Sequence, residues 1–460
     1  MCGISGIVFK DNQNGMQIYQ SLLAIQHRGQ DGAGIFWANK QETNIKKSPG
    51  LINQVFDLEE LKNMNGHLYL GHNRYKTNQI ANSFQPFLIN EHIQMSLCHN
   101  GNIINVCDVI DLLYKDFQKK IDFISDSHVI SIYISEYLNK LTLNSVLTFD
   151  HIIELSNHLQ NILEGSFSLL LAFQDFGIVA IRDKQGIRPL SYGKNKNGEY
   201  LISSESCSFN HTDFTYISDV KAGETILFHQ NGKKHYSFFQ NSEVLQTYFK
   251  PCLFEYIYFS RADSHINDIS VYQFRFQLGQ ALGKYITAKN IDYIVPTPDT
   301  SRIYAYGLSS VTNIPIQEAI VLNRYVNRTF IGENKQNIQS KIQQKFSIIR
   351  ELIEGKNILI IDDSIVRGNT SKGIVDFVKK CDPLSVYFAS AAPKIYNSNH
   401  YGIYIEKKEE LITYENPSNE DIARFIGVQN VFYNDLEETL NIVRNLNSGI
   451  KNMEISMFLE

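Results

Sequence analysis

The stretch "ILIIDDSIVRGNTSKGIV" (358–375) reads as a buried strand, a short loop and the start of a helix. The apolar run ends in two acidic residues, Asp362 and Asp363, and the loop that follows contains Ser, Gly and Thr. Free backbone N–H groups and the dipole at a helix N-terminus favour a bound phosphate. Paired carboxylates at the carboxyl end of a strand suit a ribose diol or a hydrated Mg²⁺. The stretch therefore predicts a phosphate-binding loop. The alternative, an acidic turn that only caps a helix, does not explain why a strand, two acids and this loop occur together.

The sequence around this loop, from about residue 255 onward, alternates short apolar runs with stretches of helical length. The other runs are "IDYIVPTPDT" (291–300), "IPIQEAIVL" (314–322) and "LSVYFASAAP" (384–393). Buried runs that alternate with helices are typical of a parallel sheet in an α/β domain. We therefore predict an α/β domain with a parallel sheet in this half.

The first half of the chain, to about residue 240, has a different pattern. Short strand-like runs with Gly and Asn turns dominate it, at 67–75, 93–101, 166–174, 176–183 and 199–206. Helices are predicted at 16–27, 127–140 and 150–163. This pattern predicts an α+β domain of stacked antiparallel sheets covered by helices, with a boundary near 240–255.

The overall composition excludes several classes of protein. The 460 residues are 43% hydrophobic and 20% charged, as in ordinary globular domains, and the net charge of -5 offers no basis for binding nucleic acid. No run approaches the roughly 18 apolar residues that a membrane helix needs, and no secretory signal is visible. The six cysteines form no CxxC pair, which fits a reducing compartment. We expect a cytoplasmic protein with neither nucleic acid nor membrane as a partner.

Cys2 follows the initiator methionine and is flanked by small residues. If Met1 is removed, Cys2 carries a thiol and a free α-amine on one residue. A neutral α-amine, with a pKa near ~8, can take the proton from the thiol directly or through water. Taken alone, Cys2 could equally be an incidental small residue.

The loop at 362–370 resembles the phosphoribosyl pyrophosphate (PRPP) loop of type I phosphoribosyltransferases. The resemblance implies that Asp362 and Asp363 contact the ribose hydroxyls and a metal ion. Thr300, in "PTPDTS" (296–301), matches a Mg²⁺ ligand of that family. The residues matched to the 5-phosphate cradle are Ser364, Ile365, Val366, Arg367, Gly368, Asn369 and Thr370.

Four segments of the first half resemble class II glutamine amidotransferases, which are N-terminal-nucleophile hydrolases with an αββα sandwich. They are "HRGQDGAG" (27–34), "GHNRY" (71–75), "CHNGNI" (98–103) and "SDS" (125–127). The resemblance implies that Cys2 attacks the glutamine carboxamide. The other matched residues are Asn100 and Gly101 for the oxyanion, Arg74 for the glutamine α-carboxylate and Asp126 for its α-amino group.

Taken together, the two halves resemble the amidophosphoribosyltransferase family. That resemblance implies a glutaminase domain at 2–240, a phosphoribosyltransferase domain at 255–445 and a C-terminal tail at 446–460. The implied reaction converts glutamine, PRPP and water to 5-phosphoribosylamine, glutamate and pyrophosphate with Mg²⁺, the first committed step of purine biosynthesis. A homotetramer inhibited by purine nucleotides is also implied. Only Cys252 matches the cysteines that hold an iron–sulfur cluster in some relatives, so no cluster is expected.

The segment expected to close over PRPP is less basic than the family pattern. Leu322, Ile338 and Gln343 stand where basic residues are usual, while Arg324 and Arg328 remain as candidate PRPP ligands. Drift compensated by a displaced lysine is one explanation. Two others stay open: a paralogue with an active glutaminase and another sugar-phosphate acceptor, or a nucleotide-sensing protein with a weakened transferase.

Overall fold

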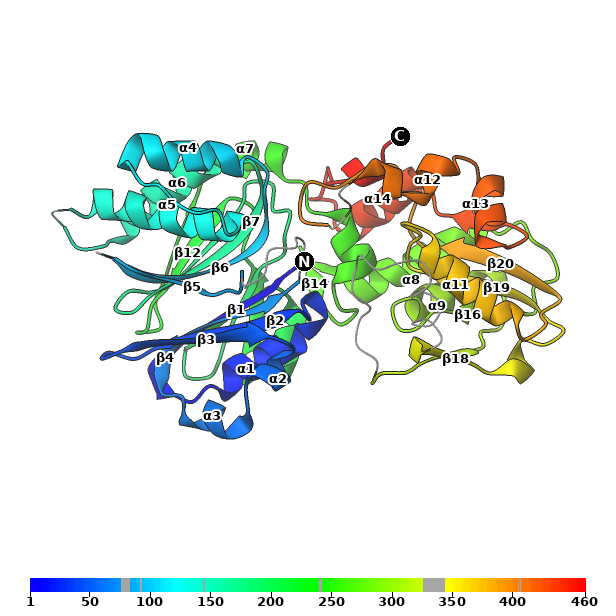
Figure 1. The fold of residues 1–460 in the computed structure, drawn as a ribbon, viewed down its shortest axis with the longest axis horizontal. Helices are drawn as coiled ribbons and strands as arrows, with labels where there is room; N and C mark the ends of the chain where they lie inside the picture. The colour runs from blue at the N-terminus through cyan, green and yellow to red at the C-terminus, as the bar shows by residue number, and fades with distance from the viewer. Residues whose placement is uncertain are drawn as a thin grey trace.

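The computed structural model describes residues 1–75, 83–91, 93–143, 145–239, 242–325, 344–403, 405 and 407–460. The chain folds into two halves that lie side by side, the first blue to green and the second green to red (Figure 1). The N-terminus lies where the halves meet, and the C-terminus lies at the upper edge of the second half in this view.

Two antiparallel sheets stack face to face in the first half (Figure 1). The first has the spatial order β11 (Thr215–Asp219), β9 (Ser191–Lys194), β10 (Tyr200–Ser203), β1 (Gly3–Gln13), β4 (Gly66–Arg74), β2 (Gly32–Ala38) and β3 (Thr43–Pro49). The second has the order β13 (Lys234–Phe238), β12 (Glu224–Phe228), β8 (Gly177–Arg182), β7 (Gly165–Phe173), β6 (Gln94–Ile103) and β5 (Phe87–Asn90). Buried residues of both sheets, such as Ile4, Leu70, Leu170 and Ala180, form one apolar layer between them.

Helices cover the outer face of each sheet and complete the predicted αββα sandwich. The first sheet carries α1 (Met16–Ala24), η1 (Gln26–Arg28), α2 (Ile52–Val55) and α3 (Leu58–Asn63). The second carries α4 (Val106–Phe117), α5 (Asp126–Leu141) and α6 (Phe149–Ile162). η2 (Ser206–His211) packs near α1, and α7 (Ser242–Tyr248) follows the last strand.

A four-stranded parallel sheet forms the centre of the second half, in the order β16 (Tyr293–Pro296), β19 (Asn357–Asp362), β20 (Ser385–Ser390) and β21 (Val431–Tyr433). Its strands are buried on both faces: Leu359 and Ile361 pack on one side of β19, and Ile358 and Ile360 on the other. The first face carries α8 (Val271–Leu282), α9 (Arg302–Thr312) and α14 (Leu436–Leu446). The second carries α11 (Asn369–Lys379) and α13 (Asn419–Ile426). The predicted parallel sheet is confirmed.

Shorter elements connect this sheet to the rest of the molecule. They are a π-helical turn η3 (Glu255–Phe259), β14 (His265–Ile266), β15 (Ile269–Ser270), η4 (Gly283–Tyr285), η5 (Arg350–Leu352), η6 (Lys408–Glu410), α12 (Ile412–Glu415) and η7 (Ser456–Phe458). Residues 446–460, predicted as a tail, pack back on the second half, where Met453, Met457 and Phe458 belong to its core.

One predicted parallel strand is wrong. Of residues 314–322, β17 (Ile320–Leu322) pairs antiparallel with β18 (Phe346–Ile348), while Ile316 reaches the parallel sheet through a single bridge to Ile294. Pro315 has no N–H to donate, and Glu318 turns outward to an ion pair with Arg302, so the segment does not continue along the sheet. β21, with three residues too short to predict, is the fourth strand instead.

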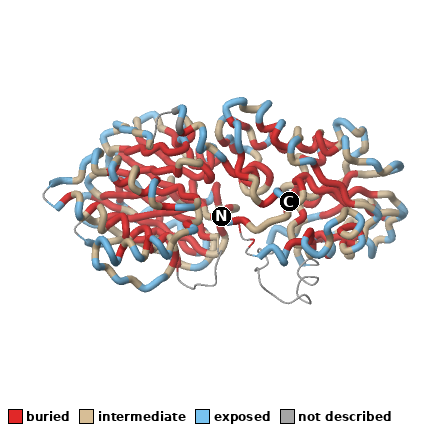
Figure 2. Tube along the Cα trace, turned by 90° about the horizontal axis from the view of Figure 1, so that it is seen from above, coloured by how far each residue is buried: buried red, intermediate tan, exposed pale blue. Residues whose placement is uncertain are grey.

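Burial follows the two layered cores, with red segments through the centre of each half (Figure 2). Among the described residues, no helix combines the length and apolar character needed to cross a bilayer.

Candidate active sites

The paired ends of β1 and β4 bring Cys2 and Arg74 together. Gly3 pairs with Asn73 across these antiparallel strands, so the residue before Gly3 and the residue after Asn73 are neighbours. Arg74 is 7% exposed, and its guanidinium lies 4.9 Å from the centre of the Phe84 ring. Burial lowers the pKa of Arg74, with Cys2 and Asp31 acting in the opposite direction. A cation is thus held beside the Cys2 thiol.

Asn100, on β6 of the other sheet, faces the backbone of Cys2. The Cys2 N–H donates to Asn100 Oδ1 at 3.2 Å. The Asn100 side chain is fully buried, and its Nδ2 has no hydrogen-bond partner in the part of the chain that the structure describes. An unpaired buried N–H is costly, so a donor left open next to Cys2 suits an oxygen atom of a ligand.

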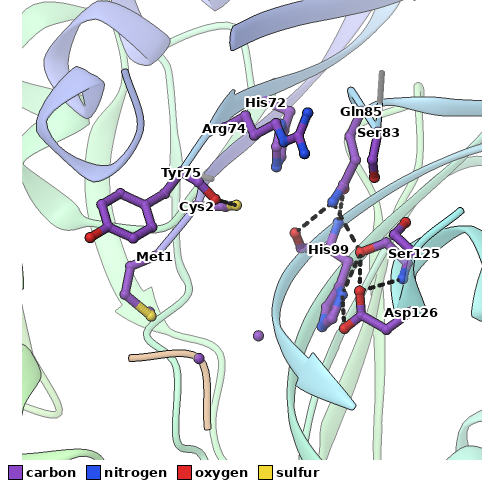
Figure 3. Close-up of a pocket in the computed structure, with 13 residues that line it drawn as sticks. Met1, Cys2, His72, Arg74, Tyr75, Ser83, Gln85, His99, Ser125 and Asp126 are labelled. Carbon is purple, nitrogen blue, oxygen red and sulfur yellow. Dashed lines mark hydrogen bonds and ion pairs between the residues drawn. The ribbon is translucent and has the colours of Figure 1, made fainter. Parts of the chain in front are cut away.

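Asp126 lies across the pocket from Cys2, at the first turn of α5 (Figure 3). Its carboxylate accepts from the Ile103 N–H at 3.1 Å and from the Ser127 N–H at 2.7 Å. These donors fix one carboxylate near the mouth of the pocket, where its side chain remains 21% exposed. The pocket, of about 50 Å³, therefore has a cation at one side and an anion at the other.

Several polar residues of this pocket were given no role by the sequence analysis. The His99 ring contacts Ser127 Oγ at 2.9 Å, and Gln85 Oε1 accepts from the His99 N–H at 2.6 Å. Both ring nitrogens of buried His72 have no partner among the described residues, and burial holds the pKa of His72 well below its usual range. His72 and His99 stand inside the matched segments 71–75 and 98–103, so the signal was present, but their burial was not visible.

A segment of the second half closes one side of this pocket. The Asn102 side chain donates to the His400 carbonyl at 2.8 Å, and Ser166 Oγ donates to the Tyr401 carbonyl at 3.0 Å. Gly402 and Met1 line the pocket with the residues of the first half. The cysteine site is thus bordered by both halves.

The second candidate site lies at the carboxyl edge of the parallel sheet. Thr297 N–H donates to the Ile361 carbonyl at 2.9 Å, and Ser301 Oγ donates to Asp362 Oδ1 at 3.1 Å. These bonds hold the loop 296–301 against Asp362, with Thr300 next to the bonded serine. Burial, and then the neighbouring Asp363 carboxylate, raise the pKa of Asp362 well above its usual range. Two carboxylates here are unfavourable without a cation or a ribose donor beside them.

The loop 364–370 leads from β19 into α11. Gly368 precedes α11 with φ of +74°, and a Cβ there would lie 2.4 Å from Ile412 Cδ1, so both backbone and packing require glycine. Asn369 and Thr370 form the first turn of the helix, where N–H groups are free of intrahelical partners. Ser364 Oγ donates to Asp363 Oδ1 at 2.8 Å.

Three residues matched to the phosphate cradle, Ile365, Val366 and Arg367, are held by contacts within the protein. Ile365 is buried in the apolar core, and the Val366 carbonyl accepts from the Ile412 N–H, so only backbone groups of these two could serve a phosphate. Arg367 Nε donates to Glu410 at 2.9 Å. These contacts attach the loop to the core and to η6, and the match of the three residues to the phosphate cradle stays a prediction.

The segment expected to close over the second site is only partly described. Leu322 ends β17, and the Arg324 side chain is 77% exposed and 4.0 Å from Asp299. Arg328, Ile338 and Gln343 lie outside the described residues. Arg324 is thus near the loop that contains Thr300.

Cys252 is buried, and desolvation raises the pKa of its thiol to about 12. In the described ranges, no three His, Cys, Asp or Glu side chains gather as they would around a metal ion. The expectation that no iron–sulfur cluster is bound stays a prediction.

Comparison with known proteins gives the family. Residues 72–211 match the family described as a glutamine amidotransferase domain. The whole chain is 35% identical to the amidophosphoribosyltransferase of Pasteurella multocida and 34% identical to that of Escherichia coli, in each case over 92% of the relative. The chain belongs to the amidophosphoribosyltransferase family. The yeast Saccharomyces cerevisiae enzyme is 35% identical over 96% of this chain.

Solved structures of amidophosphoribosyltransferases agree with this assignment. The glutamine PRPP amidotransferase of B. subtilis, complexed with ADP and GMP, has a TM-score of 0.82 and 30% identity, covering 99% of this chain and 94% of that one. The allosteric regulatory enzyme of purine biosynthesis has a TM-score of 0.81, 29% identity, and covers 96% of this chain and 91% of that one. The amidophosphoribosyltransferase family catalyses the first step of purine biosynthesis, and the predicted fold class, an αββα sandwich followed by a phosphoribosyltransferase domain, is confirmed.

Proposed function

We propose that this chain releases ammonia from glutamine at Cys2 and transfers it to C1 of PRPP, giving 5-phosphoribosylamine, glutamate and pyrophosphate. The observation that carries the proposal is the contact of the Cys2 nitrogen with Asn100 Oδ1, beside an Asn100 Nδ2 that has no partner among the described residues. In this proposal residues 2–240 are the glutaminase domain and residues 255–445 are the phosphoribosyltransferase domain. The C-terminal residues 446–460 are a segment attached to the latter.

The glutaminase step begins after Met1 is removed. The Cys2 α-amine takes the thiol proton, and the thiolate attacks the glutamine carboxamide carbon. Asn100 Nδ2 and the Gly101 N–H donate to the oxyanion, a contribution of about 3 kcal/mol per donor in comparable sites. The proton passes to the leaving nitrogen as ammonia departs, and water releases glutamate from the thioester.

Glutamine is recognised by its two charged ends. The buried Arg74 guanidinium binds the α-carboxylate, for which a planar fork of donors is well suited. Asp126 accepts hydrogen bonds from the α-ammonium, with Ile103 and Ser127 holding its carboxylate in place. The opposite charges fix the carboxamide over Cys2.

PRPP is bound at the loop after β19. Asp362 and Asp363 accept from the ribose hydroxyls, while the backbone of 364–370 and the side chains of Ser364, Asn369 and Thr370 bind the 5-phosphate. Arg324, and Arg328 outside the described residues, are further proposed ligands of PRPP. Exclusion of water from this site prevents the loss of ammonia and the hydrolysis of the product.

The donor set fits Mg²⁺. Asp362 and Asp363 are adjacent oxygen ligands with an unfavourable shared charge, and Mg²⁺ commonly takes one or two carboxylates together with substrate phosphates. Asp362, Asp363 and Thr300 would hold the ion. Bound there, Mg²⁺ would neutralise the pyrophosphate as it leaves.

The enzyme is further proposed to act in the cytoplasm as a homotetramer regulated by purine nucleotides. Support for the regulators comes from the B. subtilis relative, which is complexed with ADP and GMP. Size-exclusion chromatography tests the tetramer, and nucleotide inhibition of the purified enzyme tests the regulation.

One assay tests the proposed function against its alternatives. Glutamate and pyrophosphate are measured with glutamine and Mg²⁺, with and without PRPP. We expect PRPP to stimulate glutamate release and to give pyrophosphate in equal amount. Glutamate release indifferent to PRPP would favour another sugar-phosphate acceptor, and the absence of both products would favour a nucleotide-binding protein.

Gly101→Ala tests the oxyanion donor. A Cβ built at Gly101 lies 2.0 Å from the Ser166 carbonyl oxygen and 2.7 Å from His99 Nε2, so β6 must shift away from β7. We expect the glutaminase kcat to fall by about 10²–10³-fold, as when an oxyanion donor is lost. Ammonia-dependent pyrophosphate release should persist.

A matched control is Gly449→Ala, where the nearest atom to a built Cβ is Asn447 Oδ1 at 3.1 Å. Its activities should equal those of the wild type. Unchanged glutamine turnover in Gly101→Ala would contradict the oxyanion assignment.

A further inference from the structure

Glu255 joins the second half of the molecule to the cysteine site of the first. It is 1% exposed and begins the π-helical turn η3. Glu255 Oε1 accepts from Arg28 Nη2 at 2.8 Å and from Arg188 Nη1 at 3.0 Å, and Oε2 accepts from Arg28 Nη1 at 3.1 Å. Both arginines belong to the first half and are equally buried. The carboxylate is thus an internal counter-ion between the halves.

Arg28 links Glu255 to Cys2, the proposed nucleophile. Its Nε donates to the Cys2 carbonyl oxygen at 3.0 Å, and its Nη1 also donates to Glu205 at 2.5 Å. The guanidinium is planar, so a fork fixed by two carboxylates also fixes the direction of Nε. The orientation of the Cys2 backbone therefore depends on both glutamates.

η3 is held by the helices of the second half. Arg275 on α8 donates to the Tyr256 carbonyl at 2.9 Å and to the Ser260 carbonyl at 2.7 Å. Tyr304 on α9 donates to the Ile257 carbonyl at 2.6 Å. α9 begins directly after Ser301, which bonds Asp362. The place of Glu255 is therefore set by α8 and by α9, and α9 begins beside the second candidate site.

We propose that Glu255 is a positioning residue for Cys2, which it orients through Arg28, so that the second half of the chain completes the glutaminase site. The inference rests on the proposed function, because it assumes that Cys2 is the nucleophile. Glu255 has no contact with the substrate in this proposal. It acts by setting the direction of Arg28, and its own negative charge acts on the nearby amine.

The negative charge of Glu255 should affect the pH dependence of glutaminase activity, an effect that a purely structural role would not have. The amine at the N-terminus has its pKa lowered to about 4 in the chain that retains Met1, first by burial and then by Arg188 and Arg28, while Cys2 and Glu255 raise it. Once Met1 is removed, the Cys2 α-amine lies among the same charges. The charges that act on the N-terminal amine include Arg28, Arg188 and Glu255, and Arg28 is paired with Glu205, which also contacts His27. The pocket beside Cys2 is lined by Arg74, which Asp31 influences, and by His72, His99 and Asp126.

The test compares Glu255→Gln with Glu255→Asp in the full-length enzyme. Glu255→Gln removes a negative charge, which favours the neutral amine, so the acid limb of the glutaminase pH profile should move down by about half a unit or more. Glu255→Asp keeps the charge but shortens the side chain, so its acid limb should stay in place. Both variants should lower the glutaminase kcat by about 10- to 100-fold with little change in the KM for glutamine, because the nucleophile is displaced.

Ammonia-dependent pyrophosphate release and thermal unfolding are measured on the same samples. The control is Glu199→Gln, which removes another buried carboxylate. Glu199 accepts hydrogen bonds from the Lys10 backbone N–H and the Asn195 side chain, and the variant should match the wild type. Wild-type glutaminase kinetics and pH profile in Glu255→Gln would overturn the inference alone. If Glu255→Gln does not fold, Glu255→Asp decides, and a wild-type kcat in that variant overturns it. A wild-type enzyme without glutaminase activity would overturn the proposed function as well.

Discussion

Cys2→Ala is expected to abolish glutamine-dependent activity while leaving ammonia-dependent activity within about twofold of the wild type. In comparable enzymes, loss of the nucleophile lowers the rate by about 10⁴-fold or more. The PRPP loop lies at the carboxyl edge of a different sheet, so ammonia supplied from solution should still react there. Glutamate release with glutamine and pyrophosphate release with ammonium chloride, both with PRPP and Mg²⁺, measure the two halves separately.

Cys107→Ala is the matched control, since Cys107 is an exposed thiol on α4 and should be silent. Mass spectrometry adds an independent reading. The active enzyme should lack Met1, because with Met1 present the Cys2 nitrogen is an amide that donates to Asn100 and cannot act as a base. An active enzyme that retains Met1, or glutamine turnover in Cys2→Ala, would contradict the nucleophile assignment.

The sequence indicated two candidate sites because each motif combines residue types that are rare together. Cys2, Arg74, Asn100 and Asp126 come from four separate segments. In the structure Cys2, Arg74 and Asp126 line one pocket, and Asn100 accepts from the Cys2 N–H. The two acids and glycine of 362–368 likewise predicted a strand, loop and helix where β19 and α11 are found. The roles of these residues stay predictions.

What the sequence did not reveal depends on contacts between distant segments. Arg28 and Glu255 are 227 residues apart, and nothing near either residue signals that they pair. The outward direction of Arg367 depends on Glu410, which is 43 residues away. The mistaken strand at 314–322 shows a similar limit, because its apolar pattern is compatible with an edge hairpin as well as with a central parallel strand.

Asp362→Asn is expected to impair PRPP use and, at the same time, to stabilise the ligand-free protein. Burial and the Asp363 carboxylate raise the pKa of Asp362, so the folded state binds this proton more tightly than the unfolded state does. The stability that Asp362 contributes is therefore present below the ordinary aspartate pKa, near ~4, and is lost as the pH rises through the raised value. At pH 7 the neutral asparagine, which can still accept from Ser301, avoids this cost.

We expect Asp362→Asn to raise the midpoint of thermal unfolding at pH 7 by about 1–3 °C, with the difference vanishing near pH 4. PRPP-dependent velocity with ammonia should fall by about 10²-fold or more, because the charged acceptor for the ribose hydroxyls and Mg²⁺ is gone. Asp376→Asn, further along α11, controls for the loss of a carboxylate and should change neither quantity. A gain in stability together with a loss of activity indicates a ligand-binding residue. If Asp362 were structural, its variant would lose both stability and activity, and that result would remove Asp362 from the PRPP site.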